Sequence, residues 1–326
     1  MDASSNKYRA LTLSIGLAAL LYLASVLLTD HRAVLSALER VSAMSLVAIF
    51  LLSLVNYLLR FWRWQCYIAA LGHKLPWRRH FLYYLAGFTL TVTPAKAGEA
   101  VRSVYLRPYG VPYIQSLAAL FVERLLDVLA MSLLALLILL LRPDYLGLVM
   151  MAWALVLGLA WLVTRPWLPA KLHSWGQHRH FSHQFDRAAR MLKAATVLLR
   201  PRLFLFGLLL GILAWGLEGT ALYLIAREAG VPLSFTVGVG IYAIAILAGA
   251  LSFLPGGLGS TEAVMGMLLI ALGTDSAVAV AITLMCRIAT LWFAVALGGL
   301  AVAALGLNKR HRTPAVLPKI TPACKP

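Results

Sequence analysis

The feature that most constrains this chain is a series of apolar runs long enough to cross a lipid bilayer. A membrane-spanning helix needs roughly 20 mostly apolar residues, and such runs recur along the whole sequence. Only 13% of the residues are charged and 61% are hydrophobic, whereas a soluble domain has about 25% charged residues. The pattern predicts a single membrane domain over residues 1–326. The predicted spans are 8–28, 44–59, 114–141, 145–164, 203–226 and 277–305.

The basic residues predict the orientation, and they account for the net charge of +17 without any nucleic acid partner. Cytoplasmic loops are enriched in Lys and Arg, and most basic residues gather on one side if both termini are cytoplasmic. The protein is then expected in the cytoplasmic (inner) membrane, with the basic loop 165–202 and the tail 306–326 on its cytoplasmic side. Anionic lipids are the expected partners of this surface. The same assignment places Arg60, Arg63, Lys74, Arg78 and Arg79 inside, and Arg32, Arg40, Arg142 and Arg227 outside.

Two apolar stretches are interrupted before they complete a span. Residues 81–93 would form a helix about 20 Å long, which is too short to cross a bilayer core of about 30 Å. Pro94 follows this stretch directly. Residues 236–254 end at Pro255, after which a glycine-rich turn leads into a short apolar run. Irregular backbone at membrane depth requires surrounding protein or a watery cavity. We therefore expect two re-entrant helical hairpins with internal tips, while a complete span over 236–254 stays open as an alternative.

The two interruptions resemble each other in residue order and spacing. Each has a proline, a glycine four positions later, the tripeptide Glu-Ala-Val, and an arginine 25 positions after the glutamate. The ordered set indicates an internal repeat, although Pro and Gly also commonly punctuate hydrophobic hairpins. The matching positions are Pro94 and Pro255, Gly98 and Gly259, Glu99 and Glu262, and Arg124 and Arg287.

With the orientation given above, the two repeats, at about 44–141 and 203–305, run in opposite directions through the membrane. Inverted repeats with broken helices meeting near the midplane are typical of secondary transporters, in which the site opens to either side in turn. The predicted fold is an all-α polytopic membrane protein. It has six full transmembrane helices plus two re-entrant helical hairpins, arranged as inverted-topology repeats.

Four motifs carry a resemblance to a known family: TPAKAGEAVRSVYL, FVERLLDVLA, SFLPGGLGSTEAV and CRIATLW. They resemble the lysylphosphatidylglycerol synthase transmembrane-region family, also called the flippase-like domain, from about residue 10 to residue 305. The resemblance implies a lipid-translocating domain that handles aminoacylated phosphatidylglycerol, polyprenyl-phosphate-linked sugars or related lipids. Larger members carry a soluble aminoacyl-transferase domain after the membrane part. This sequence stops about 20 residues after its last predicted helix, so synthase activity is not expected.

Charged residues inside the predicted helices point to a polar headgroup site. Each costs roughly 2.5–3.5 kcal/mol in a membrane helix and is usually functional. A helix that restarts after a proline also presents free N–H groups to a phosphate, and glycines permit its close approach. The candidate binding residues are Lys96, Glu99, Arg102, Arg124, Gly256, Gly257, Gly259, Glu262 and Arg287. Glu123, Asp127 and Glu218 are candidates for proton coupling, and simple ion pairing stays open as the alternative.

Lipid transport is the function that these features favour. The expected substrate is a phosphate-containing membrane lipid or a polyprenyl-phosphate-linked precursor, moved by alternating access. The chain has no GxxxxGK[ST] loop, nucleophile elbow or HExxH motif, so we expect no catalytic residue, cofactor or metal. Two alternatives stay open. One is a membrane-embedded transferase acting on a prenyl phosphate or phospholipid, and the other is an accessory scaffold of a lipid-modifying enzyme.

Overall fold

The computed structural model describes residues 39–139, 182–252 and 254–309, with isolated positions between 32 and 36 and between 150 and 174. Within these ranges the regular secondary structure is helical and contains no strand. The all-α prediction is therefore confirmed for the described part of the chain. The predicted span 8–28, most of 145–164 and the tail from residue 310 onward lie outside the described residues.

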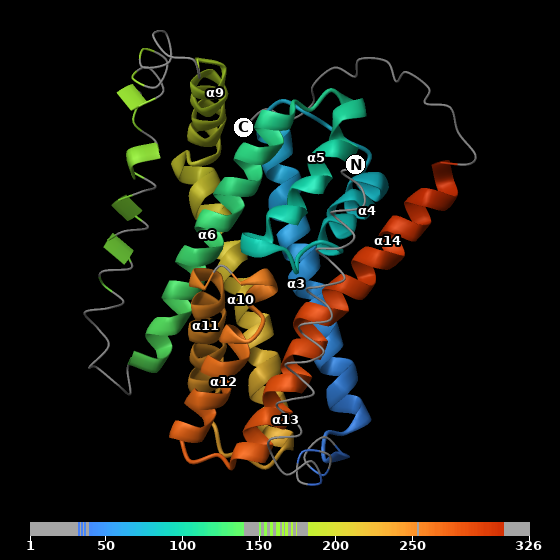
Figure 1. The fold of residues 1–326 in the computed structure, drawn as a ribbon, viewed down its shortest axis with the longest axis vertical. Coiled ribbons are helices and arrows are strands. Elements are labelled where there is room, and N and C mark those ends of the chain that lie inside the picture. Colours follow the sequence, from blue (N-terminus) through green and yellow to red (C-terminus); the bar gives the residue numbers. More distant parts are fainter. Residues whose placement is uncertain are drawn as a thin grey trace, which may run out of the picture.

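The first half of the described chain consists of a long helix, a short helical hairpin and a second long helix. In Figure 1 the long helix α3 rises from the bottom, the hairpin of α4 and α5 occupies the upper half, and α6 descends. The elements are α3 (Ala43–Ala70), α4 (Trp77–Phe88), η1 (Pro94–Val101), α5 (Arg102–Leu106), η2 (Arg107–Tyr109) and α6 (Tyr113–Leu139).

The second half repeats this order in the opposite direction. The long helix α10 packs along α3 and descends, the hairpin of α11 and α12 occupies the lower half, and α13 continues into α14, which rises (Figure 1). A π-helical turn, η5, joins the last two helices. The elements are α9 (Ser182–Leu198), α10 (Pro201–Glu228), α11 (Phe235–Leu251), η4 (Pro255–Gly257), α12 (Ser260–Ala271), α13 (Ser276–Arg287), η5 (Ile288–Trp292) and α14 (Phe293–Lys309).

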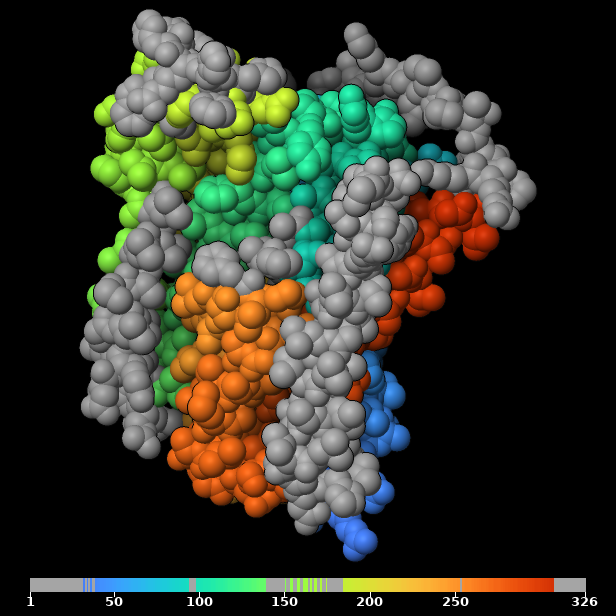
Figure 2. Space-filling model, in the orientation of Figure 1, coloured from blue at the N-terminus to red at the C-terminus, as the bar shows by residue number. Residues whose placement is uncertain are grey.

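The turns of the two hairpins meet in the middle of the molecule. η1 of the first hairpin contacts η4 of the second, and a Cβ added at Gly256 would lie only 3.2 Å from the Cα of Val92. Gly256 has a φ of 63°, a left-handed conformation that glycine adopts without steric cost. In the space-filling view, α5 and the start of α6 (teal and green) cover the upper part of one face, and the second hairpin (orange) covers the lower part (Figure 2).

The outer surfaces of the long helices are apolar. Three helical stretches, α3, α10 and Ser276–Leu307, are long and apolar enough to cross a membrane. Large apolar side chains recur every three or four positions on the outer faces of α3 and α10, as expected for one face of a helix. Apolar patches of this kind mark a contact surface, here the surface facing lipid. The exposed side chains are Leu51, Val55, Leu58 and Trp62 on α3, and Leu205, Leu209 and Leu213 on α10.

One predicted helix end is wrong. Arg60 and Arg63 do not follow the helix, because α3 continues past the predicted end at Leu59 as far as Ala70. Their side chains are buried inside the protein, with exposures of 4% and 0% for the two residues. The basic segment at 182–198, by contrast, forms the helix α9, which packs against α6 through Ala194, Ala195 and Leu198.

Candidate functional site

A network of buried arginines and carboxylates lies above the point where the hairpins meet. Arg102 donates hydrogen bonds to Glu123, at 3.1 Å, and to Glu99. Glu99 also accepts from Thr91 at 2.9 Å, and Glu123 accepts from Tyr84 at 3.0 Å. Buried charges are tolerated where they are paired and hydrogen-bonded. These contacts tie α4, η1, α5 and α6 together around one ionic centre.

Asp127 extends the network across α6 to α3. Its Oδ1 accepts a 2.5 Å hydrogen bond from Arg63, which also donates to the carbonyl of Gly207 at 3.4 Å. Its Oδ2 lies 3.1 Å from Arg124 and 3.9 Å from Arg60. Asp127 thus lies within 4.0 Å of three arginines, and so does Glu123, whose partners are Arg63, Arg102 and Arg124.

The second hairpin has its own ion pair. Arg287, the last residue of α13, donates to Glu262 at 2.7 Å and to the carbonyl of Gly256 at 2.9 Å. The equivalent pair in the first half, Arg124 and Glu99, lies at 3.7 Å. Each glutamate of the repeat therefore pairs with the arginine 25 positions later. The sequence spacing is reflected in two real contacts.

The glycine-rich turn that precedes α12 needs left-handed backbone conformations, and one of its N–H groups already has an acceptor. Gly256, Gly257 and Gly259 all have positive φ, at 63°, 68° and 84°. The N–H of Gly259 donates to Glu262 at 2.8 Å. A built-in carboxylate thus occupies the start of α12, where the sequence led us to expect open donors for a phosphate.

A cavity of about 250 Å³ opens beside these charges. Apolar side chains and glycine backbone of α6, α10, α11 and η4 form most of its wall, and Arg124, Asp127 and Arg287 supply its charged groups. The side chain of Arg124 is 23% exposed, and that of Arg287 is 3% exposed. The chamber therefore combines room for an apolar chain with two guanidinium groups.

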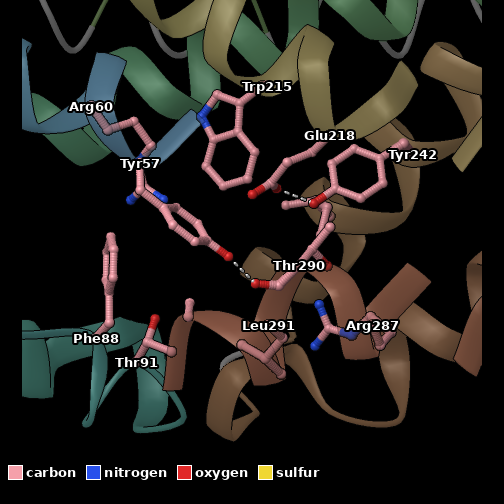
Figure 3. A pocket seen from close by; sticks show the side chains of 12 residues that line it. Tyr57, Arg60, Phe88, Thr91, Trp215, Glu218, Tyr242, Arg287, Thr290 and Leu291 are labelled. Atoms are coloured by element: carbon pink, nitrogen blue, oxygen red, sulfur yellow. Dashed lines mark hydrogen bonds between the residues drawn. The ribbon is translucent and has the colours of Figure 1, made fainter. Parts of the chain in front are cut away.

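A smaller polar cavity, of about 30 Å³, adjoins the large one. Figure 3 shows Arg60 on one side and Arg287 on the other. Tyr57 donates to the Thr290 carbonyl at 2.6 Å, and Tyr242 donates to Glu218. Both cavities share the wall residues Trp215, Ile246, Arg287 and Leu291.

The structure brings most of the predicted site residues into two neighbouring groups. Glu99, Arg102, Glu123, Arg124 and Asp127 form the network on the first hairpin and α6. Gly256, Gly259, Glu262 and Arg287 form the second. Gly257 lines the large cavity, and Glu218 lines the small one. The side chain of Lys96 lies outside the described residues.

Sequence reasoning missed the contribution of α3. Arg60, Arg63 and Tyr57 line cavities or hold carboxylates, and all three lie on its buried face. Helical spacing is the signal that could have found them. Asn56, Arg60 and Arg63 are spaced by four and three positions, which places them on one face of a helix that continues past residue 59.

The class of protein follows from two features. The long helices carry outward-facing leucines, and they surround an ionised centre, as in a polytopic membrane protein. Residues 10–298 match the family described as Lysylphosphatidylglycerol synthase TM region. The match covers most of the chain, so this protein belongs to that family, and the resemblance inferred from its motifs is confirmed.

Individual relatives share shorter stretches. A UPF0104 membrane protein of Methanothermobacter thermautotrophicus is 39% identical over 92 residues, which are 28% of this chain and 28% of the relative. A UPF0104 membrane protein of Pyrococcus horikoshii is 29% identical over 127 residues, which are 39% of this chain and 35% of the relative. The matched stretches thus span no more than 35% of either relative. Both names state that the relatives are membrane proteins.

Proposed function

We propose that this protein moves a phosphate-containing amphipathic lipid, or a lipid-linked precursor, across the cytoplasmic membrane. One observation carries the proposal: an apolar chamber of about 250 Å³ that is bordered by Arg124 and Arg287. An apolar wall suits a lipid chain, and guanidinium groups suit a phosphate through planar, charge-assisted hydrogen bonds. The same cavity can therefore hold both parts of such a molecule.

Alternating access is the mechanism that the helix order favours. In this proposal six helices span the membrane, α4–α5 and α11–α12 are re-entrant hairpins from opposite sides, and the halves form inverted-topology repeats. The opposite directions of α3 and α10 and the contact of η1 with η4 support it. Rocking one half against the other would then expose the chamber to each side in turn. Both termini lie in the cytoplasm in this arrangement.

The arginines differ in how firmly the protein already holds them. Arg287 donates two hydrogen bonds within the protein. Arg124 lies 3.1–3.7 Å from three carboxylates, yet its buried Nε and Nη2 make no hydrogen bond within the described part of the chain. Arg124 thus has N–H groups left for a phosphate, and Arg287 fixes the opposite wall of the chamber.

Among the proton-coupling candidates, Glu218 is the one that lines the small cavity. Glu123 and Asp127 each lie within 4.0 Å of several arginines, and nearby positive charge favours the ionised carboxylate. Glu218 lies against the hydroxyl of Tyr242 and borders the small cavity. Protonation of Glu218 would remove one negative charge from the path of an anionic headgroup.

Translocation of a fluorescent phosphatidylglycerol in proteoliposomes tests the proposal. Arg124→Lys and Arg287→Lys keep the charge but lose the planar fork of donors, so we expect the double variant to lose at least about tenfold in rate, corresponding to about 1.4 kcal/mol. Arg187→Lys, an exposed change on α9, serves as the matched control and should leave the rate unchanged. Full activity in a folded double variant would remove both arginines from the mechanism.

A further inference from the structure

Arg60 is a buried arginine whose hydrogen-bonding capacity is largely unused. It is 4% exposed, and its Nε and Nη2 make no hydrogen bond within the part of the chain that the structure describes. Its nearest carboxylate oxygen, Oδ2 of Asp127, is 3.9 Å away, which is too far for a hydrogen bond. Arg63 and Arg102, by contrast, each donate hydrogen bonds to carboxylates.

Two aromatic rings hold the guanidinium of Arg60 at the edge of the small cavity. It lies 5.0 Å from the ring centroid of Trp215 and 5.5 Å from that of Phe88, within the range of a cation–π contact. Both rings line the small cavity together with Arg60. These contacts fix the position of the charge, while Nε and Nη2 make no hydrogen bond within the described residues.

We propose that Arg60 and the small cavity bind the phosphate of the transported lipid, while the large apolar chamber binds its chain. This inference rests on the proposed function and names the part of the site that holds the headgroup. The shared wall at Trp215 and Arg287 places the two cavities side by side. A single amphipathic molecule can therefore occupy both.

The dimensions and charges of the small cavity suit phosphate oxygens. Its volume of about 30 Å³ exceeds the roughly 10–15 Å³ needed for one water molecule, so it accommodates about two oxygen-sized groups. Arg60 and Arg287 border it from opposite sides (Figure 3). Glu218 also lines it, so a phosphate there meets one carboxylate as well as two guanidinium groups.

Equilibrium binding of radiolabelled dodecyl phosphate to the full-length protein in dodecyl maltoside micelles tests the inference. Arg60→Lys keeps the charge and removes the planar donors, and we expect the Kd to rise at least about tenfold, since hydrogen bonds to charged groups contribute about 1.5–3 kcal/mol. Ala294→Leu fills the small cavity from α14 without changing any charge, and it should weaken binding to a similar extent. Arg187→Lys should bind as the wild type does.

The possible outcomes separate this inference from the proposed function. Suppose that the wild type binds saturably, that Arg124→Lys weakens binding, and that Arg60→Lys and Ala294→Leu leave it intact. This result overturns the role of Arg60, while the proposed role of the large chamber is retained. If Arg60→Lys does not fold, Ala294→Leu decides alone, and unchanged binding in that variant overturns the inference. Absence of saturable wild-type binding overturns both proposals. If inorganic phosphate binds as tightly as dodecyl phosphate, the ligand is a free anion, and this result overturns the lipid assignment.

Discussion

At the scale of single residues, the buried charges depend on one another, and Asp127 shows this most directly. Arg63, Arg124 and Arg60 lie 2.5, 3.1 and 3.9 Å from its carboxylate oxygens. Removing one partner of a buried pair leaves an uncompensated charge, which destabilises a protein far more than the pair itself stabilises it. The network therefore acts as a unit in which each charge makes its neighbours tolerable.

Asp127→Asn tests this dependence. The change removes the negative charge that all three guanidinium groups share, although Arg63 and Arg124 keep Glu123 nearby. We expect a loss of about 3–5 kcal/mol in the free energy of unfolding, measured by denaturation in detergent. Asp275→Asn is the matched control. Asp275 is the N-cap of α13 and accepts the N–H groups of Ala277 and Val278, a role that Asn fills equally well. Equal stabilities of the two variants would contradict the network.

Residue pairing could be predicted from the sequence where a repeat existed, and not elsewhere. The spacing of 25 positions singled out Glu99 with Arg124 and Glu262 with Arg287, and both pairs are in contact. No such repeat marks Arg60 and Arg63. Counting positive charges placed them on the cytoplasmic side, beyond a helix end at Leu59. Hydrophobicity falls along the second half of α3 and cannot show that carboxylates on α6 compensate these arginines.

At the scale of elements, the hairpins are held by backbone approaches that only glycine permits. Gly298 of α14 packs on the turn after α4, where an added Cβ would lie 2.9 Å from the carbonyl carbon of Phe88. The sequence predicted both hairpins from a proline that interrupts an apolar stretch. It could not predict that the first restart would be a 3₁₀ helix or that Arg287 would precede a π turn, because both depend on packing between distant segments.

Gly298→Ala and Gly299→Ala form a matched pair on α14. The added methyl group at Gly298 meets the backbone of Phe88 and Thr89, whereas nothing lies within 4 Å of a Cβ at Gly299. We expect Gly298→Ala to lower the free energy of unfolding by about 1–3 kcal/mol through overpacking. Gly299→Ala should raise it by about 0.5–1 kcal/mol, because Ala favours the helix over Gly. Thermal denaturation of the purified variants measures both, and destabilisation by Gly299→Ala alone would contradict the packing.

At the scale of the whole molecule, the two halves are related by direction. α3 rises and α10 descends, and the hairpins approach each other from opposite ends. The apolar spans and the repeated motif led us to expect inverted-topology repeats, which stay a prediction. The sequence also predicted a polar headgroup site with Arg124 and Arg287, and both residues line the large cavity. It could not predict that the rest of the wall would be mostly apolar, because that wall combines side chains from both halves. Two groups of charged residues that border one chamber agree with the alternating access proposed above.

Single-cysteine labelling in intact cells tests the resulting topology. In a background lacking Cys66, Cys286 and Cys324, we place a cysteine at Arg107, exposed after the first hairpin, or at Ser276, exposed after the second. The proposed orientation puts Arg107 in the cytoplasm and Ser276 outside, because basic residues concentrate on the cytoplasmic side. A membrane-impermeant maleimide should therefore label Ser276→Cys in intact cells and Arg107→Cys only after permeabilisation. The reverse pattern would invert the orientation, and labelling of both sites from outside would place the two hairpins on one face and refute alternating access between them.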